Sequence, residues 1–188
     1  QSVKELTKDS HTVLIQNNAG IGAGFSNSDY ENSGAKIVNS AEDIFNDSEM
    51  IIKVKEPQMN EVEMLKENQI LFTYLHLSAA PHLTKGLIDS KSICIAYETV
   101  TDQNNKLPLL APMSAVAGRM SIQAGAYSLE KHKGGSGILL GGAPGVLPGK
   151  VLILGGGVVG ENAAIIATGM QAKVFITDKS EQRLEELK

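Results

Sequence analysis

The sequence predicts an α/β protein built on parallel sheets, and two observations support this fold class. First, apolar runs of strand length alternate with segments of helical character, a pattern typical of parallel sheets with helical crossovers. Second, a glycine-rich turn follows one apolar run and precedes an apparent helix. The expected strands are residues 12–15, 36–38, 50–55, 69–76, 92–97, 151–154 and 174–177. The helices expected between the first five of these strands are residues 41–45, 61–66 and 81–88.

The glycine-rich turn has the spacing of a dinucleotide-binding fingerprint. Residues 151–160 read VLILGGGVVG, so an apolar strand runs directly into the glycines. Gly155 allows a tight turn, Gly157 leaves room for a pyrophosphate, and Gly160 lets the following helix lie close to the strand. The pyrophosphate would then meet the helix N-terminus, where unpaired N–H groups and the helix dipole favour negative charge. This arrangement predicts the first part of a Rossmann nucleotide-binding domain.

Asp178 follows the next apolar strand, about 20 residues beyond the turn, where an acidic residue accepts hydrogen bonds from the adenosine ribose hydroxyls. This position predicts NAD rather than NADP as the cofactor. Asp178 also fits the N-cap of a terminal helix, with Glu181 as the third helical residue of a capping box. The two interpretations are compatible, and we favour the ribose contact.

The composition indicates a globular protein with small-molecule ligands. The 188 residues carry a formal net charge of −4 without a basic stripe, which argues against nucleic acid as a partner. Cys94 is the only cysteine, and no spacing of His, Cys and carboxylate residues indicates a metal site. No apolar run approaches the roughly 20 residues of a membrane span, and no signal-peptide pattern opens the chain. We therefore expect a soluble, cytoplasmic protein with no membrane partner.

Three ionisable residues stand where expected strands end: Lys55, His76 and Glu98. Open parallel sheets bind ligands beyond the carboxyl ends of their strands, so neighbouring strands would bring these side chains to one cleft. Each residue also has a purely structural explanation. Lys53 and Lys55 share a strand face and both fit solvated positions, and His76 fits a half-buried histidine bonded to backbone. Glu98 fits a loop cap or a lysine partner, and its role stays open.

The sequence pattern changes near Pro108, from alternating strands and helices to a long segment rich in small residues, and this change predicts two domains. Residues 1–107 are expected to form a substrate domain with a Rossmann-like or flavodoxin-like parallel sheet, lacking its first strand. Residues 108–188 are expected to form a connecting helix and the first part of the Rossmann domain. The connecting helix is expected over residues 115–131, with Ser114 as its N-cap and with small residues that permit close packing. Because both ends look as though they interrupt helices, we expect an internal piece of a longer protein.

Six short blocks carry a family resemblance that covers essentially the whole chain, in order. They are KVKEP at residues 53–57, LFTYLHL at 71–77, AYETV at 96–100, LLAPMS at 109–114, VAGR at 116–119 and GGAPG at 141–145. Together they resemble the L-alanine dehydrogenase family, to which the NAD-binding subunit of proton-translocating transhydrogenase is related. The resemblance implies an NAD-dependent enzyme, a homo-hexamer, that interconverts L-alanine with pyruvate and ammonium.

The resemblance also assigns roles to individual residues. Lys55 matches the family lysine that contacts the substrate oxygens, and His76 matches the histidine that bonds the substrate and transfers a proton. The candidate cofactor-binding residues are Met113 and Ser114 at the nicotinamide end, Gly155, Gly157, Val158 and Gly160 in the turn, and Asp178 at the ribose. The family's arginine for the substrate carboxylate and its further catalytic aspartate match no position here, so we expect no turnover by residues 1–188 alone. Ala115 stands where many relatives carry Glu.

Two other functions stay open at the level of sequence. The NAD-binding subunit of a transhydrogenase would bind NADH without consuming pyruvate and ammonium. A non-catalytic product would only bind a nucleotide or associate with an intact paralogue. We expect the second less, because half a Rossmann sheet leaves an apolar face and an open edge unprotected.

Overall fold

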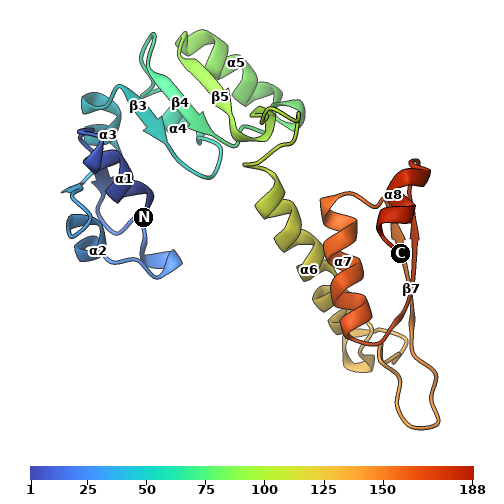
Figure 1. Ribbon diagram of the computed structural model, residues 1–188. Helices are drawn as coiled ribbons and strands as arrows, with labels where there is room; N and C mark the ends of the chain where they lie inside the picture. The colour runs from blue at the N-terminus through green and yellow to red at the C-terminus, as the bar shows by residue number, and fades with distance from the viewer. The chain divides into compact units, whose positions relative to one another are not determined.

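A computed structural model describes residues 1–188, which fold as two compact units, residues 1–100 and 101–188 (Figure 1). The domain boundary expected between residues 107 and 108 stays a prediction. None of the helices is both long enough and apolar enough to cross a membrane.

Parallel strands form the framework of the first unit. One sheet pairs β1 with β2, and the other has the order β3-β4-β5, with every pairing parallel. The strands are β1 (Leu14–Gln16), β2 (Lys36–Val38), β3 (Met50–Ile52), β4 (Ile70–Thr73) and β5 (Ile93–Ala96). All five expected strands are therefore present, and the α/β class is confirmed. Because β3 and β4 end at Ile52 and Thr73, Lys55 and His76 lie in the loops that follow these strands.

Short helices and 3-10 turns precede, connect and follow these strands. The helices are α1 (Ser2–Lys8), α2 (Asn27–Glu31), α3 (Ala41–Asp47), α4 (Met59–Val62) and α5 (Pro81–Ser90), and the 3-10 turns are η1 (Ile21–Ala23), η2 (Leu77–Ala79) and η3 (Tyr97–Thr99). The Ser40 hydroxyl caps α3 by accepting from the Asp43 amide, and Pro81 supplies the fixed φ that favours the first turn of α5. The helix expected over residues 61–66 ends at Val62, because tighter turns follow and carry Leu65 into the core.

The core of the first unit surrounds the central strand, β4. Leu71 and Leu75 are almost completely buried, together with Phe45 from α3 and Leu83 and Leu87 from α5. Figure 1 shows α5 running along the sheet that β3, β4 and β5 form. A strand buried in this way is rigid, so it gives the loop after it a fixed starting point.

The second unit contains one long helix and the predicted strand-turn-helix-strand motif. Its elements are α6 (Ala111–Ser128), η4 (Lys131–Lys133), β6 (Lys150–Leu154), α7 (Val158–Gly169), β7 (Lys173–Thr177) and α8 (Glu181–Glu186). Strands β6 and β7 pair in parallel. The buried residues that pack them against α6 and α7 are Ile122, Leu140, Ile153, Ala163 and Ala167.

The prediction that Ser114 caps the long helix is wrong. Helix α6 begins at Ala111, and the Ser114 amide already donates to the carbonyl of Leu110, at 3.0 Å. Pro112 explains the earlier start, since proline fits the first helical turn and has no N–H to leave unpaired there. The helix also ends at Ser128 rather than at residue 131.

Close packing of α6 on α7, expected from its small residues, is confirmed at Gly118. A Cβ atom at this position would lie 2.2 Å from the carbonyl oxygen of Val159 and 2.9 Å from the Cβ of Asn162. Only glycine allows this approach. The contact holds α6 against the first turn of α7, next to the glycine-rich turn.

Candidate functional site

The glycine-rich turn has the stereochemistry that its spacing predicts. Gly155 has φ +98° and donates its N–H to the carbonyl of Thr177, at 2.7 Å. A Cβ on Gly160 would lie 1.8 Å from the Gly155 carbonyl oxygen, whereas a Cβ on Gly157 would meet no atom within 4 Å. Gly160 therefore lets α7 pack on the turn, and Gly157 leaves open space at the N-terminus of that helix.

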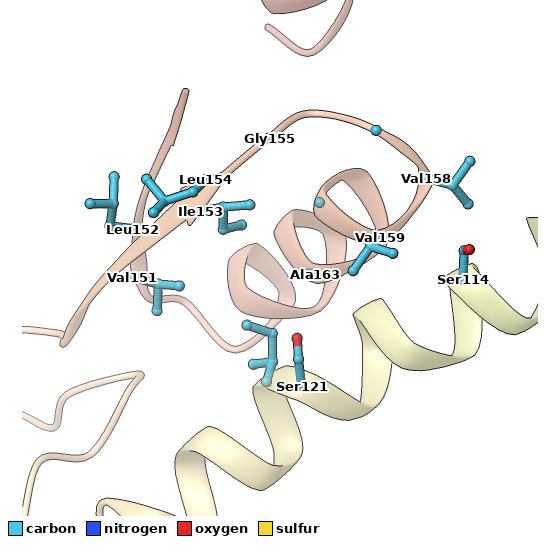
Figure 2. A pocket seen from close by; sticks show the side chains of 13 residues that line it. Ser114, Ser121, Val151, Leu152, Ile153, Leu154, Gly155, Val158, Val159 and Ala163 are labelled. Atoms are coloured by element: carbon cyan, nitrogen blue, oxygen red, sulfur yellow. The ribbon is translucent and has the colours of Figure 1, made fainter. Parts of the chain in front are cut away.

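A cavity of about 500 Å³ adjoins this turn. Figure 2 shows the side chains that line it, from Ser114 and Ser121 on α6, from β6 and from the first turn of α7. Gly155, Gly157, Val158 and Gly160 all belong to the lining, so the structure brings most of the predicted cofactor residues together. Met113 is 43% exposed and does not belong to this lining.

The turn fits a dinucleotide pyrophosphate. The first amides of α7 have no partner within the helix, as at every helix N-terminus. The open space over Gly157 lets a phosphate come near them. The residues that would hold the group are therefore backbone atoms of the turn and of the first turn of α7.

Asp178 follows β7 and bonds directly to the turn. Its Oδ2 atom accepts from the Gly156 amide at 2.6 Å, and its Oδ1 atom accepts from the Ser180 amide at 2.9 Å. The bonds from Ser180 and Gly156 lower the pKa of Asp178, so the group is ionised at neutral pH. An ionised carboxylate has about four acceptor sites, so Asp178 retains capacity for a ribose hydroxyl.

The predicted capping box at Asp178 is wrong. Ser180 is the N-cap of α8, and its hydroxyl accepts from the Arg183 amide at 3.2 Å. The carboxylate of Asp178 is already bonded to the Gly156 and Ser180 amides, and the Ser180 hydroxyl caps the helix instead.

Arg183 also supports the turn, a role that the sequence does not predict. Its Nε atom donates to the Gly156 carbonyl at 2.7 Å, and its Nη2 atom pairs with Glu161 of α7 at 2.6 Å. Both peptide atoms of Gly156 are thus held by side chains, the amide by Asp178 and the carbonyl by Arg183. An arginine in a polar terminal helix gives no sequence signal for this contact.

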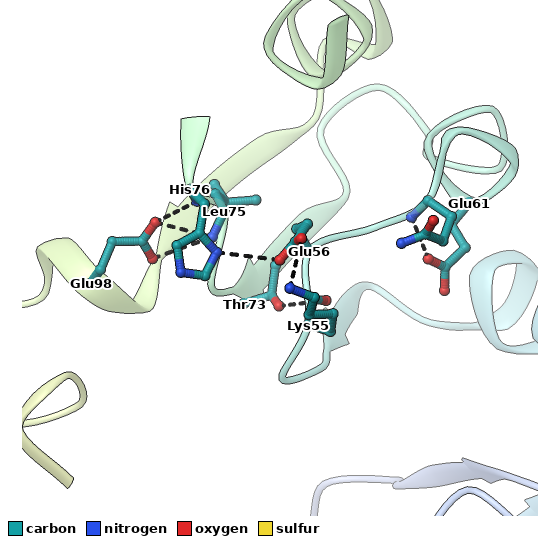
Figure 3. A network of polar contacts seen from close by, with 8 residues as sticks. Lys55, Glu56, Glu61, Thr73, Leu75, His76 and Glu98 are labelled. Carbon is teal, nitrogen blue, oxygen red and sulfur yellow. Dashed lines mark hydrogen bonds and ion pairs between the residues drawn. The ribbon is translucent and has the colours of Figure 1, made fainter. Parts of the chain in front are cut away.

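A second polar cluster lies in the first unit, at the carboxyl ends of β3 and β4 (Figure 3). Glu56 accepts from the Lys55 ammonium at 2.9 Å through Oε1, and its Oε2 lies 3.2 Å from Nδ1 of His76. The Thr73 hydroxyl donates to the carbonyl of Lys55 at 3.1 Å, which ties this loop to the end of β4. The expectation that Lys55 and His76 converge is therefore supported by the geometry, and Glu56 joins them.

Glu98 contacts the His76 main chain instead of its ring. Its Oε1 atom accepts from the His76 amide at 2.7 Å and from the Leu75 amide at 3.1 Å. Burial raises the pKa of Glu98, but bonds from its own amide and from these two amides outweigh burial and lower it. His76 has φ 49° and ψ 37°, the left-handed region that is unfavourable for a residue with a side chain. Glu98 thus caps the loop and holds His76 in this conformation.

The two lysines of the KVKEP block differ. Lys53 forms an ion pair with Glu61 of α4 and is 23% exposed, whereas Lys55 is 74% exposed. The interpretation of both as solvated residues is wrong for Lys53. Glu56 was missed as a site residue because an acidic residue beside a lysine, followed by Pro57, looks like an ordinary loop pair.

The parallel strands and the glycine turn define an α/β protein of the dinucleotide-binding class. Comparison with known proteins gives the family. The family model for the alanine dehydrogenase/PNT N-terminal domain matches residues 1–117, and the model for the C-terminal domain matches residues 121–188. The chain belongs to the alanine dehydrogenase/PNT family, which implies a nicotinamide dinucleotide cofactor.

The similar proteins agree with this assignment. The chain is 57% identical to an alanine dehydrogenase of Halomonas elongata, over 98% of this chain and 50% of that protein. It is 56% identical to an alanine dehydrogenase of Methanococcus maripaludis, over 93% of this chain and 47% of that protein. A solved L-alanine dehydrogenase has 53% identity and a TM-score of 0.91 over 99% of this chain and 51% of that one. The chain thus spans about half the length of the curated relatives it matches.

A solved transhydrogenase from Sinorhizobium meliloti has a TM-score of 0.80 at 21% identity, covering 99% of this chain and 55% of that one. This similarity shows a shared fold and nothing more.

Proposed function

We propose that the complete gene product containing these residues is an NAD-dependent L-alanine dehydrogenase. It interconverts L-alanine, water and NAD with pyruvate, ammonium and NADH. The observation that carries the proposal is the convergence of Lys55 and His76 on Glu56, in a chain that is more than half identical to alanine dehydrogenases.

Lys55 is suited to bind the substrate oxygens. Its side chain is 74% exposed and comes from the loop that follows β3. A fixed positive charge stabilises the negative charge that develops on a carbonyl oxygen during the reaction. We therefore assign to Lys55 the binding and polarisation of the 2-oxo group of pyruvate.

His76 is suited to move a proton. An imidazole exchanges protons near neutral pH, and His76 lies in the same cluster with 46% of its side chain exposed. We assign to it the removal of a proton from the water that adds to the imine carbon, and the return of that proton in the reverse direction.

The second unit supplies the cofactor site. Gly155, Gly157, Val158 and Gly160 would hold the pyrophosphate, Asp178 the adenosine ribose, and Met113 with Ser114 the nicotinamide end. When bound, NAD accepts the hydride from the substrate α-carbon. The ionised Asp178 favours NAD over NADP, because a 2′-phosphate would bring further negative charge beside it.

The family resemblance further supports a homo-oligomer, a hexamer, for the complete protein, and the single cysteine fits a cytoplasmic location. Inactivity of residues 1–188 by themselves stays a prediction.

The test is an NADH oxidation assay with the complete gene product. Oxidation must require pyruvate and ammonium together, and Lys55→Ala and His76→Ala must abolish it. Lys53→Ala is the matched control. It also removes one lysine charge, but Lys53 lies two residues before Lys55 and is already paired with Glu61. NADH binding without oxidation would favour the transhydrogenase-like alternative, and equal losses in the two lysine variants would contradict the role of Lys55.

A further inference from the structure

The carboxylate of Glu56 contacts both residues that the proposed function uses. Its two oxygens have separate partners, Nζ of Lys55 at 2.9 Å and Nδ1 of His76 at 3.2 Å (Figure 3). The Glu56 side chain is 23% exposed, less than either partner. It comes from the loop after β3, whereas His76 comes from the loop after β4, so the contact links two strand ends.

The charge state of Glu56 fixes the direction of its bond to His76. The bond from Lys55 and, next, the bond from its own backbone amide lower the pKa of Glu56 to about 2, so the carboxylate is ionised at neutral pH. An ionised carboxylate is an acceptor only, so Nδ1 of His76 must carry the hydrogen. A neutral imidazole has one N–H group. The Nε2 atom is then the ring nitrogen with the free lone pair.

Two further contacts restrict His76. Glu98 accepts from the His76 amide at 2.7 Å and holds the main chain in the left-handed conformation. The imidazole also stacks on Tyr74, with ring centroids 5.9 Å apart and an interplanar angle of 22°. The main chain, one ring face and Nδ1 are thus each held by a different partner.

We propose that Glu56 is a positioning residue that sets the tautomer of His76, with the proton on Nδ1 and with Nε2 as the atom that exchanges protons with the substrate. This inference rests on the proposed function. As water adds to the protonated imine, its oxygen bonds to carbon, the C=N π electrons move to nitrogen and neutralise its positive charge, and Nε2 takes the proton from the breaking O–H bond. The Glu56 carboxylate then balances the charge of the imidazolium, and the proton returns by the same path in reverse.

A simpler role for Glu56 is a surface ion pair with the adjacent Lys55. Exposed ion pairs contribute little to stability, so this role predicts no effect of Glu56 on the ring nitrogens of His76. The two roles therefore differ in a measurable way, independent of turnover.

The first test is the ¹⁵N NMR spectrum of the imidazoles in the complete gene product. It is recorded at a pH above the ordinary titration range of histidine, so that the imidazoles are neutral. The signal of His76 is identified by its loss in His76→Asn. We expect Nδ1 of His76 to be protonated and Nε2 to be unprotonated. A proton on Nε2 in the unaltered protein overturns the inference without any need for a variant.

The second test compares Glu56→Gln with Glu61→Gln, which removes the matching carboxylate that pairs with Lys53. A glutamine presents both a donor and an acceptor, so Glu56→Gln should produce a mixture of His76 tautomers, and kcat should fall by about 100-fold. Glu61→Gln should leave the His76 spectrum unchanged. An unchanged spectrum and kcat in Glu56→Gln would refute the positioning role while the dehydrogenase proposal stands. Protonated Nδ1 in a protein that oxidises no NADH would support the tautomer and refute the proposed function.

Discussion

Replacement of Gly160 by alanine tests the structural basis of the nucleotide site. The new Cβ would lie 1.8 Å from the Gly155 carbonyl oxygen and 3.2 Å from Cγ2 of Ile153, whereas ordinary contact begins at 3.4 Å. The nearest obstacle is backbone, so a rotamer change cannot relieve it, and α7 must move away from the turn. Overpacking of this kind lowers the free energy of unfolding by about 3 kcal/mol. The higher helix propensity of alanine raises it by only about 1 kcal/mol.

Gly169→Ala is the matched control, since Gly169 also lies in α7 and a Cβ there would meet no atom within 4 Å. We expect Gly160→Ala to lower the melting temperature of the complete gene product and to weaken NADH binding at least tenfold, measured by fluorescence titration. Gly169→Ala should retain NADH binding. Equal melting temperatures and equal NADH affinities in the two variants would refute the close packing of α7 on the turn.

Three further predictions concern the side chains around the two sites. Glu98→Gln should lower kcat by about tenfold, because a neutral amide holds the His76 and Leu75 amides less strongly than a carboxylate does; an unchanged kcat would contradict this role. Arg183→Ala should raise the Kd for NADH several-fold, since the Gly156 carbonyl and Glu161 lose their shared partner; an unchanged Kd in a fluorescence titration would count against it. The lowered pKa values of Glu98 and Asp178 contribute stability that is present above the ordinary values of 4.5 and 3.8 and is lost as the pH falls below them. Urea unfolding at a series of pH values should therefore show that the free energy of unfolding falls less steeply with decreasing pH in Glu98→Gln than in the unaltered protein. Parallel pH dependences of the two proteins would contradict the role of Glu98.

The features that sequence predicted well depend on local stereochemistry. The spacing of Gly155 and Gly160 predicts a turn and a close helix contact, because Gly155 takes a positive φ and a Cβ on Gly160 would clash with the Gly155 carbonyl, both within one short segment. The parallel strands were also predictable, since apolar runs alternate with helical segments along the chain.

The features that sequence did not predict depend on competition between partners. Ser114 and Asp178 both fit N-caps by residue type, but Pro112 starts α6 earlier and the Gly156 amide engages Asp178. Glu56 and Arg183 act across gaps of 20 and 27 residues, toward His76 and Gly156. Such contacts follow from the packed structure and leave no periodic pattern in one sequence.

The most direct test of the proposed function follows the transferred hydride. The complete gene product is given pyruvate, ammonium and NADH that carries deuterium at the transferable position of the nicotinamide, and the products are analysed by mass spectrometry. We predict L-alanine with one deuterium on its α-carbon, formed by the unaltered protein and absent with His76→Ala. Bound NADH together with unlabelled products would contradict the assignment of this protein as an alanine dehydrogenase.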